Sequence, residues 1–399
     1  MRRAFAVILT IASAVLYACT GDDTAVTTSD GGTDGGDIVD SSMVTDASDA
    51  ADAGDSAAPC APFVLPPSCV VDASDVPDDL RCTAIYDDFD ARKLACGVLE
   101  YAPAFALWSD GAIKRRFIQI PAGAKIDVTD MDQWSFPPGT KIWKEFQLPF
   151  DGGLALVETR LFQKLANGAW RWATYVWSSD NKTAMRNDNG VKGVLGTTYE
   201  IPTQMQCNDC HGGRFDKILG FDGVLLSAPE ATGLTYAELL RLGLVTSSRG
   251  APPMPSALQI PGTPTERAAL GYLHANCGVG CHNEQAQSPA NASGLHMRLA
   301  AAKLGTATGT DTVVTGANKT PGHQWPGEPT APDGGWFDIH PGDLSRSLMP
   351  ARMASRNVDG GRAQMPPIIS HQVDDAGLNA IKTWIESMTV DAGYPAPTP

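Results

Sequence analysis

Two short motifs place a histidine directly after a pair of cysteines, and they constrain this chain more than any other feature. The first motif is Cys207-Asn208-Asp209-Cys210-His211, in which two residues separate the cysteines. The second motif is Cys277-Gly278-Val279-Gly280-Cys281-His282, in which three residues separate them. Whatever fold the chain adopts must present two thiols and one imidazole together at each of these places.

The first spacing is the attachment pattern of c-type haem. Two thiols add across the vinyl groups of the porphyrin, and the adjacent histidine becomes the proximal ligand of the iron. Two glycines in the second spacer would let the longer loop fold tightly. The sequence therefore predicts two haem c groups. The predicted attachment residues are Cys207, Cys210, Cys277 and Cys281, and the predicted iron ligands are His211 and His282.

Cysteine pairs with this spacing also occur as redox dithiols, as disulfides and as halves of zinc sites. A four-cysteine zinc site could take one pair from each motif. A plain disulfide is the alternative for Cys277 and Cys281. None of these alternatives needs a histidine after the second cysteine, and its presence in both motifs favours haem.

Residues 1–18 have the pattern of a secretory signal, with Arg2 and Arg3 before an apolar run that is too short to span a membrane. They end in Leu16-Tyr17-Ala18 before Cys19, which resembles a bacterial lipobox. We therefore predict a lipoprotein signal peptide and a lipidated Cys19; a cysteine within an ordinary signal peptide is the alternative. Thr20 after Cys19 favours the outer membrane, with the protein periplasmic or surface-exposed in the cell envelope.

Residues 19–58 are predicted to be a disordered acidic linker. From residue 20 onward this segment holds ten Asp, no Lys or Arg, and few large apolar residues, so it cannot bury enough apolar surface to order itself. Most of the net charge of −15 lies here. No basic patch is left to meet phosphates, which argues against nucleic-acid binding. Residues 391–399 are expected to be a disordered tail.

Nine cysteines divide among three predicted roles. Cys19 and the four motif cysteines leave a set that is free for disulfides, which form outside the cytoplasm where haem is also attached. This set is Cys60, Cys69, Cys82 and Cys96. Four cysteines allow three pairings, and we favour Cys60–Cys69 with Cys82–Cys96 because both loops would be short.

Residues 59–200 are expected to form a β-rich domain, sandwich or barrel-like. β-branched and aromatic residues alternate in several runs, and Asn167-Gly168 indicates a hairpin. The run Trp170–Trp177 is partly apolar on both faces, which favours a central strand. Six of the nine tryptophans fall between Trp108 and Trp177. Most of them are expected in the core, and a tryptophan-lined binding surface is the alternative.

Residues 201–262 are predicted to be the first haem-binding segment, and residues 263–390 a class I-like cytochrome c domain. The predicted fold class is therefore a multidomain chain in which a mainly α-helical cytochrome c-like region follows the β-rich domain. Thr263 and Glu266 form a capping box for a helix that leads into the second motif. Asp374 can cap a second helix with an apolar stripe.

Met365 precedes two prolines that stiffen its loop, and it is the predicted sixth iron ligand of the second haem. Its distance of 83 residues from His282 is long but acceptable. For the first haem, Met254 in a similar Pro-Met-Pro setting is the first candidate, followed by Met353 and His274. A five-coordinate iron is the alternative. Arg346 and Arg352 are candidates for pairing with haem propionates.

Short phrases along most of the folded chain carry a family resemblance. They are Leu107-Trp108-Ser109-Asp110-Gly111, Lys114-Arg115-Arg116-Phe117-Ile118, Trp134-Ser135-Phe136-Pro137-Pro138-Gly139-Thr140, Glu158-Thr159-Arg160-Leu161, Tyr175-Val176-Trp177, Ser293-Gly294-Leu295, Pro341-Gly342-Asp343 and both cysteine motifs. Residues 100–390 thus resemble a family of largely uncharacterised exported bacterial proteins. The resemblance implies an N-terminal β domain joined to a dihaem cytochrome c-like region. The family has C-x-x-C-H at both sites, whereas the second motif here has one inserted residue.

Three functions are compatible with these features. The leading hypothesis is an exported electron carrier that exchanges electrons with a redox partner protein. The second is a dihaem peroxidase-like enzyme or other oxidoreductase with one open iron. The third is a surface lipoprotein that binds a ligand through its tryptophans.

Overall fold

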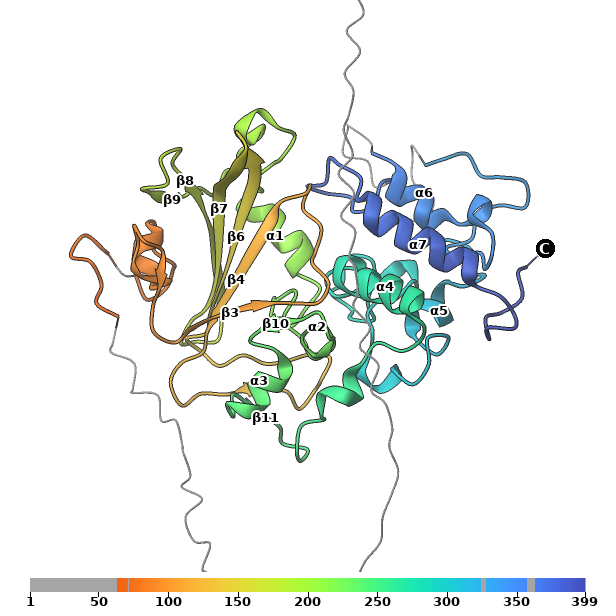
Figure 1. The fold of residues 1–399 in the computed structure, drawn as a ribbon, viewed down its shortest axis with the longest axis horizontal. Helices are drawn as coiled ribbons and strands as arrows, with labels where there is room; N and C mark the ends of the chain where they lie inside the picture. The colour runs from red at the N-terminus through yellow and green to blue at the C-terminus, as the bar shows by residue number, and fades with distance from the viewer. Residues whose placement is uncertain (1–62, 71, 324–327, 357–362, 399) are drawn as a thin grey trace, which may run out of the picture. The chain divides into compact units, whose positions relative to one another are not determined.

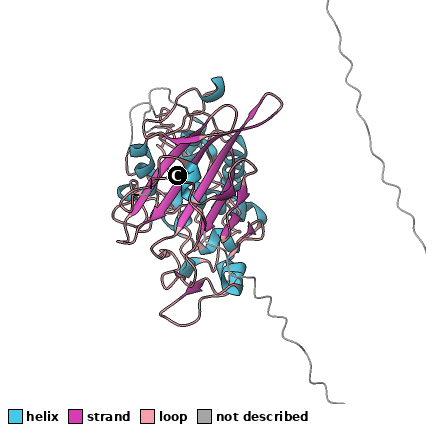
Figure 2. Ribbon diagram, turned by 90° about the vertical axis from the view of Figure 1, so that its left-hand side faces the viewer, coloured by secondary structure: helices cyan, strands magenta, loops and turns pink. Residues whose placement is uncertain are grey.

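A seven-stranded antiparallel sheet forms the largest part of this computed structural model (Figures 1 and 2). Its strand order is β10-β3-β4-β6-β7-β8-β9, and β1 with β2 and β11 with β5 form two further small sheets. The strands are β1 (Tyr86–Asp88), β2 (Lys93–Leu94), β3 (Val98–Ala102), β4 (Ile113–Gln119), β5 (Ile126–Asp127), β6 (Lys141–Phe150), β7 (Gly153–Lys164), β8 (Trp170–Trp177), β9 (Ala184–Arg186), β10 (Thr232–Gly233) and β11 (Val245–Thr246).

The structure describes residues 63–70, 72–323, 328–356 and 363–398. Predictions for the signal peptide, the lipidated Cys19, the acidic linker and Cys60 lie outside these residues. The helices are α1 (Gln204–His211), α2 (Gly223–Ser227), α3 (Tyr236–Arg241), α4 (Pro264–Leu273), α5 (Asp311–Gly316), α6 (Leu348–Ala354) and α7 (Asp375–Ser387). Within the described residues, no helix has the length and apolarity that crossing a membrane requires.

Both faces of the large sheet are covered. Phe117 and Trp143 are cross-strand neighbours in the core of one face, and Ile118 and Ile142 are cross-strand neighbours in the core of the other. Successive residues of a strand point to opposite faces, so apolar residues at consecutive positions mark a sheet buried on both sides. Residues 218–258 fold back over the second face, and their apolar side chains join its core.

The strands that local sequence signals predict are confirmed. β7 and β8 form a hairpin around Asn167-Gly168. β8 pairs with β7 on one side and with β9 on the other, so it is an interior strand. Four of the six clustered tryptophans are at most 7% exposed, which confirms that most of these rings are core. These four are Trp134, Trp143, Trp170 and Trp177.

Two predicted helices are also confirmed. α4 begins after Thr263, whose side chain forms a capping box with Glu266. α7 begins after Asp374, whose carboxylate accepts a hydrogen bond from the Gly377 N–H at 3.0 Å. The apolar stripes of α4 and α7 belong to one core, and the two helices lie side by side in Figure 1.

The predicted fold class is nevertheless wrong. Helices make up only 25% of the chain, and the cytochrome c-like, mainly α-helical region is not formed. Between the second motif and α7, the described chain is mostly loop with the short helices α5 and α6. The capping signals of α4 and α7 are local, and they do not determine the structure of the residues between them. The sandwich or barrel is also wrong, because the seven-stranded sheet is open and, in the described chain, only two-stranded sheets, helices and loops cover its faces.

The predicted disulfide pairing is wrong as well. Cys69 pairs with Cys82, with their Cα atoms 5.5 Å apart, and Cys96 is in a disulfide too. Cys82 lies in a buried 3-10 turn, Leu80–Thr83, that Asp79 caps. Because this turn fixes where the Cys82 thiol points, proximity in space rather than a short loop selects its partner.

Gly377 marks the closest approach of α7 to the α4 side. A Cβ atom at this position would lie 2.2 Å from the Tyr272 ring. Helix propensity alone would make Gly377→Ala stabilising by about 1 kcal/mol. We expect Gly377→Ala to lower the free energy of unfolding by about 1–3 kcal/mol instead, because the packed Tyr272 ring must move. Chemical denaturation measures this, with the exposed α7 substitution Asn379→Ala as the control that should be neutral or slightly stabilising.

Candidate functional site

The two cysteine–histidine motifs, which are far apart in the sequence, touch through their backbones. A Cβ atom on Gly213 would lie 2.0 Å from the Gly280 carbonyl oxygen, and one on Gly280 would lie 3.0 Å from the Cys210 carbonyl oxygen. Only glycine permits such an approach. The end of the first motif therefore packs directly on the spacer of the second.

The inserted residue of the second motif is accommodated by a wider helical turn. After α4 the chain continues as a π-helical turn, His274–Gly278. The Val279 N–H bonds to the His274 carbonyl at 2.9 Å, and the His282 N–H bonds to the Cys277 carbonyl at 2.8 Å. Both hydrogen bonds span five residues, as a π-turn requires. The turn thus absorbs one extra residue while keeping both thiols and the imidazole in one local structure.

All four motif cysteines are free thiols, so the alternative disulfide between Cys277 and Cys281 is not formed. Burial raises the pKa of Cys210 to about 11 and the pKa values of Cys277 and Cys281 to about 12. Redox dithiols and zinc sites use thiolates. Across the described residues, no three His, Cys, Asp or Glu side chains come together as a metal cluster would require.

Each motif histidine is oriented by a backbone carbonyl. Nδ1 of His282 lies 3.2 Å from the Leu295 oxygen, and Nδ1 of His211 contacts the Lys217 oxygen. Burial lowers the pKa of His282 to about 4 and that of His211 to about 3. A neutral ring that donates from Nδ1 leaves the Nε2 lone pair for a metal. This is the state that an axial haem ligand needs.

A cavity of about 610 Å³ opens beside the motifs, within the range of about 300–1,000 Å³ that holds bound organic ligands. Cys277, Cys281 and His282 of the second motif and Cys210 of the first line it. Four methionines also line it, and they are Met297, Met349, Met353 and Met365. Thiols, an oriented imidazole and thioethers around an apolar space fit a covalently bound haem with a methionine on its second side.

The loop that carries Met365 is fixed from two directions. Arg356 donates to the backbone oxygens of Met353 at 3.0 Å and of Gln372 at 2.9 Å. Asp110, from the loop before β4, accepts hydrogen bonds from the His371 N–H at 2.9 and 3.0 Å. The predicted ligand Met365 thus lies on a loop held between α6 and the sheet region, on the cavity wall.

The candidates for the sixth ligand of the first haem are not brought to His211. Met254 is 66% exposed and is not among the cavity-lining residues. His274 is buried; its Nδ1 accepts from the Leu299 N–H at 2.9 Å, and its Nε2 lies 3.4 Å from Asp222. Met353 lies on the cavity wall near the second motif. Five-coordination of a first haem is therefore left open.

The two arginines predicted to meet propionates differ in placement. Arg352 lines the cavity and pairs with Glu328, and its buried Nε has no hydrogen-bond partner in the described part of the chain. Arg346 donates to the Gly334 oxygen at 3.0 Å and to the Thr398 oxygen at 3.1 Å, away from the cavity lining. Of these two arginines, Arg352 is the one placed to meet a carboxylate in the cavity.

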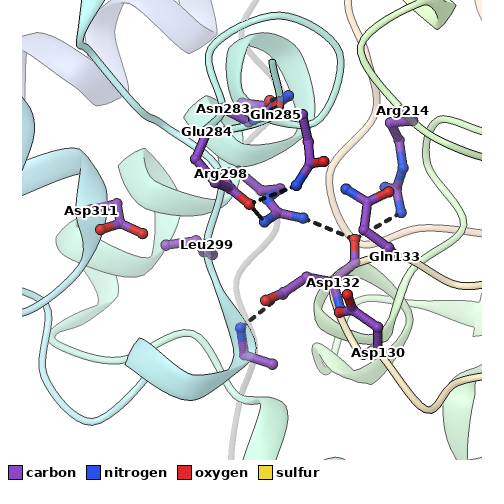
Figure 3. Close-up of polar contacts among 12 residues, drawn as sticks. Asp130, Asp132, Gln133, Arg214, Asn283, Glu284, Gln285, Arg298, Leu299 and Asp311 are labelled. Carbon is purple, nitrogen blue, oxygen red and sulfur yellow. Dashed lines mark hydrogen bonds and ion pairs between the residues drawn. The ribbon is translucent and has the colours of Figure 1, made fainter. Parts of the chain in front are cut away.

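A polar network that sequence reasoning missed holds both motifs to one loop (Figure 3). The Asp132 backbone oxygen accepts from Arg298 at 2.9 Å and from Arg214 at 3.2 Å. Arg298 also pairs with Glu284, which follows the second motif, while Arg214 follows the first. Isolated polar residues in loops give no periodic signal, so the sequence offered no means of finding this network.

Comparison with known proteins adds no relative, since no family model, no curated protein and no solved structure matches this chain. The family resemblance therefore stays a prediction.

Asp338 gives the cavity a measurable pH dependence. Burial raises its pKa from 3.8 to about 7, against the opposing effect of Arg352. Between these values the folded protein keeps a proton that the unfolded chain has lost, so the free energy of unfolding falls as pH rises and is constant above about pH 7. We expect Asp338→Asn to raise Tm at pH 8 and to leave it unchanged near pH 4. The gain in the free energy of unfolding at pH 8 is at most about 4 kcal/mol.

The control for this prediction is Asp343→Asn. Hydrogen bonding to Ser345 lowers the pKa of Asp343, so this substitution should lower Tm at pH 8 rather than raise it. An equal change in Tm on Asp338→Asn at pH 8 and near pH 4 would contradict a raised pKa of Asp338.

Proposed function

We propose that this protein binds two covalent haem c groups and transfers electrons. The observation that carries this proposal is the direct backbone contact of the two motifs at Gly213 and Gly280. Bound haem supplies one-electron chemistry. Attachment points that touch keep two such groups together, which suits the passage of electrons between them and on to a redox partner protein.

The chain's own residues have distinct parts in this proposal. The motif cysteines anchor the groups, and the two histidines present neutral Nε2 atoms whose orientation the carbonyls of Lys217 and Leu295 fix. Met365, on a loop held by Arg356 and Asp110, would supply a thioether ligand to the iron of the second group. Ligation by histidine and methionine together favours a high reduction potential.

Export of the protein is part of the same proposal. The Cys69–Cys82 disulfide is typical of a protein that folds in an oxidising compartment. Haem attachment at cysteine motifs takes place in that compartment as well. These features support the predicted signal peptide and a lipid anchor at Cys19 in the cell envelope, with the outer membrane favoured.

A second candidate function follows from the surroundings of His211. Since Met254 is exposed and His274 is bound to Asp222 and to the Leu299 N–H, the first iron would keep an open position. An open iron suits a peroxidase-like or other oxidoreductase activity. The ligand-binding lipoprotein is weakly supported, because most of its tryptophans are buried.

Haem content tests the proposal directly. Intact mass and the pyridine haemochrome spectrum of the exported protein should show two covalent haems. We expect Cys207→Ala/Cys210→Ala and Cys277→Ala/Cys281→Ala each to retain one haem. The control variant Cys69→Ser/Cys82→Ser, which removes a disulfide instead, should retain two. A single haem in the unaltered protein would mean that the second motif is not an attachment site.

Substitution of Met365 tests the ligand assignment. We expect Met365→Ala to abolish the weak methionine-to-iron absorption band of the oxidised protein and to lower the midpoint potential of one haem. Met254→Ala, at an exposed position, should leave both unchanged. If Met254→Ala rather than Met365→Ala removed the band, the ligands would have to be reassigned. High-spin bands that shift when cyanide is added would indicate an open iron at the first haem and would favour the enzyme hypothesis.

A further inference from the structure

Three basic residues stand directly opposite one another on neighbouring strands of the large sheet. Arg116 of β4 pairs in register with Lys144 of β6, and Lys144 pairs with Arg160 of β7. Directly opposite residues share a face, with Cβ atoms about 5 Å apart, and like charges in this relation are destabilising. We call Arg116, Lys144 and Arg160 the basic row. Anions that lie against such a row would relieve the repulsion.

The described chain supplies an anion to only one member of the basic row. Glu158 forms a two-point pair with Arg160 at 2.6 and 2.8 Å. Arg116 is 4% exposed and Lys144 is half-buried, and neither forms a hydrogen bond or ion pair with any residue that the structure describes. Burial lowers the pKa of both side chains, and neighbouring cations lower that of Lys144 further. A buried cation without a partner is costly, and Arg116 is in this position, with the half-buried Lys144 beside it.

The basic row faces the first motif. Phe162, which shares a sheet face with Arg160, stacks on the His211 ring with the centroids 4.3 Å apart. α1 also exchanges hydrogen bonds with the same face, because the Trp172 indole N–H donates to the Gln204 oxygen at 3.3 Å and the Gln204 amide donates to the Trp172 oxygen at 3.2 Å. Lys144 is the cross-strand neighbour of Arg160, and Arg160 lines the cavity together with Cys210.

We propose that Arg116 and Lys144, with Arg160 beside them, form a buried carboxylate-binding site that holds the propionate groups of the haem attached at Cys207 and Cys210. The inference rests on the proposed function, since it needs a haem at the first motif. Two unpartnered cations match two propionate carboxylates in charge and number. Arginine binds a carboxylate at two points, and a buried lysine supplies a compact positive charge.

The test is the midpoint potential of each haem in Arg116→Gln and Lys144→Gln, measured by spectroelectrochemistry on protein whose haem content is known. Loss of a buried positive charge favours the oxidised iron, so the potential of the first haem should fall while that of the second is unchanged. Arg115→Gln is the matched control, because Arg115 adjoins Arg116 on the opposite face and pairs with Glu100 at 2.8 Å. It should leave both potentials unchanged. Lys144→Arg, which keeps the charge, should restore most of the potential.

The Tm of Arg116→Gln in two backgrounds separates loss of a propionate partner from misfolding of the variant. With both haems attached, Arg116→Gln should lower Tm because a propionate loses its partner. In the Cys207→Ala/Cys210→Ala background it should raise Tm, because an unpaired buried cation is removed. A change of the same sign in both backgrounds would overturn the inference.

Sodium formate added to the unaltered protein tests whether the basic row binds free carboxylates rather than haem propionates. If propionates fill the basic row, added formate should change neither the midpoint potentials nor the absorption spectrum. A formate-dependent shift that Arg116→Gln abolishes would overturn the inference in favour of a site for free carboxylates. Two haems with unchanged potentials in Arg116→Gln and Lys144→Gln would overturn this inference alone, whereas absence of covalent haem would overturn the proposed function as well.

Discussion

The contact between Gly213 and Gly280 is the constraint on which the rest of the site depends. A side chain at Gly213 would force the two motifs apart, and one at Gly280 would press on the Cys210 carbonyl. The loop around Asp132 acts on the same contact from outside, because Arg214 and Arg298 bind one backbone oxygen there and each belongs to the segment after one motif. Neither motif can therefore move without disturbing the other. A protein that held two independent redox groups would not need this coupling.

Charge sets a second constraint, on the sheet rather than on the motifs. The face of the sheet that turns toward α1 changes character along β6, from Ile142 in the apolar core to Lys144 in the basic row. On the opposite face the buried Glu145 has a hydrogen-bond partner, since Tyr86 donates to it. Arg116 and Lys144, on the face beside the first motif, have no such partner among the described residues. The sheet is thus more than a support for α1, because it contributes the positive charge of the site.

Local signals in the sequence predicted local structure well. The capping box at Thr263, the cap at Asp374 and the turn at Asn167-Gly168 each depend on a few adjacent residues, and each is formed. The motif residues were proposed from their spacing alone, and their role as haem attachment sites stays a prediction. Features that depend on distant segments were not found: the partner of Cys82, the return of residues 218–258 to the sheet, and the polar network at Asp132. Alternation within a strand shows which residues share a face with Arg116 or with Lys144. Only the register between the strands shows that these two residues lie opposite one another.

The error in fold class shows what the site requires of its scaffold. α4 and α7 pack together, yet the cavity wall is built mainly from the loops that follow the second motif. Those loops are fixed by side chains bonded to backbone carbonyls, such as Arg356 with Met353 and Gln372, rather than by helix packing. A haem needs only that its anchors, its two axial ligands and its propionate partners hold their relative positions. A sheet face, one π-turn and a loop tied by an arginine can meet that requirement, so a helical bundle is not a prerequisite for the chemistry that the motifs predict.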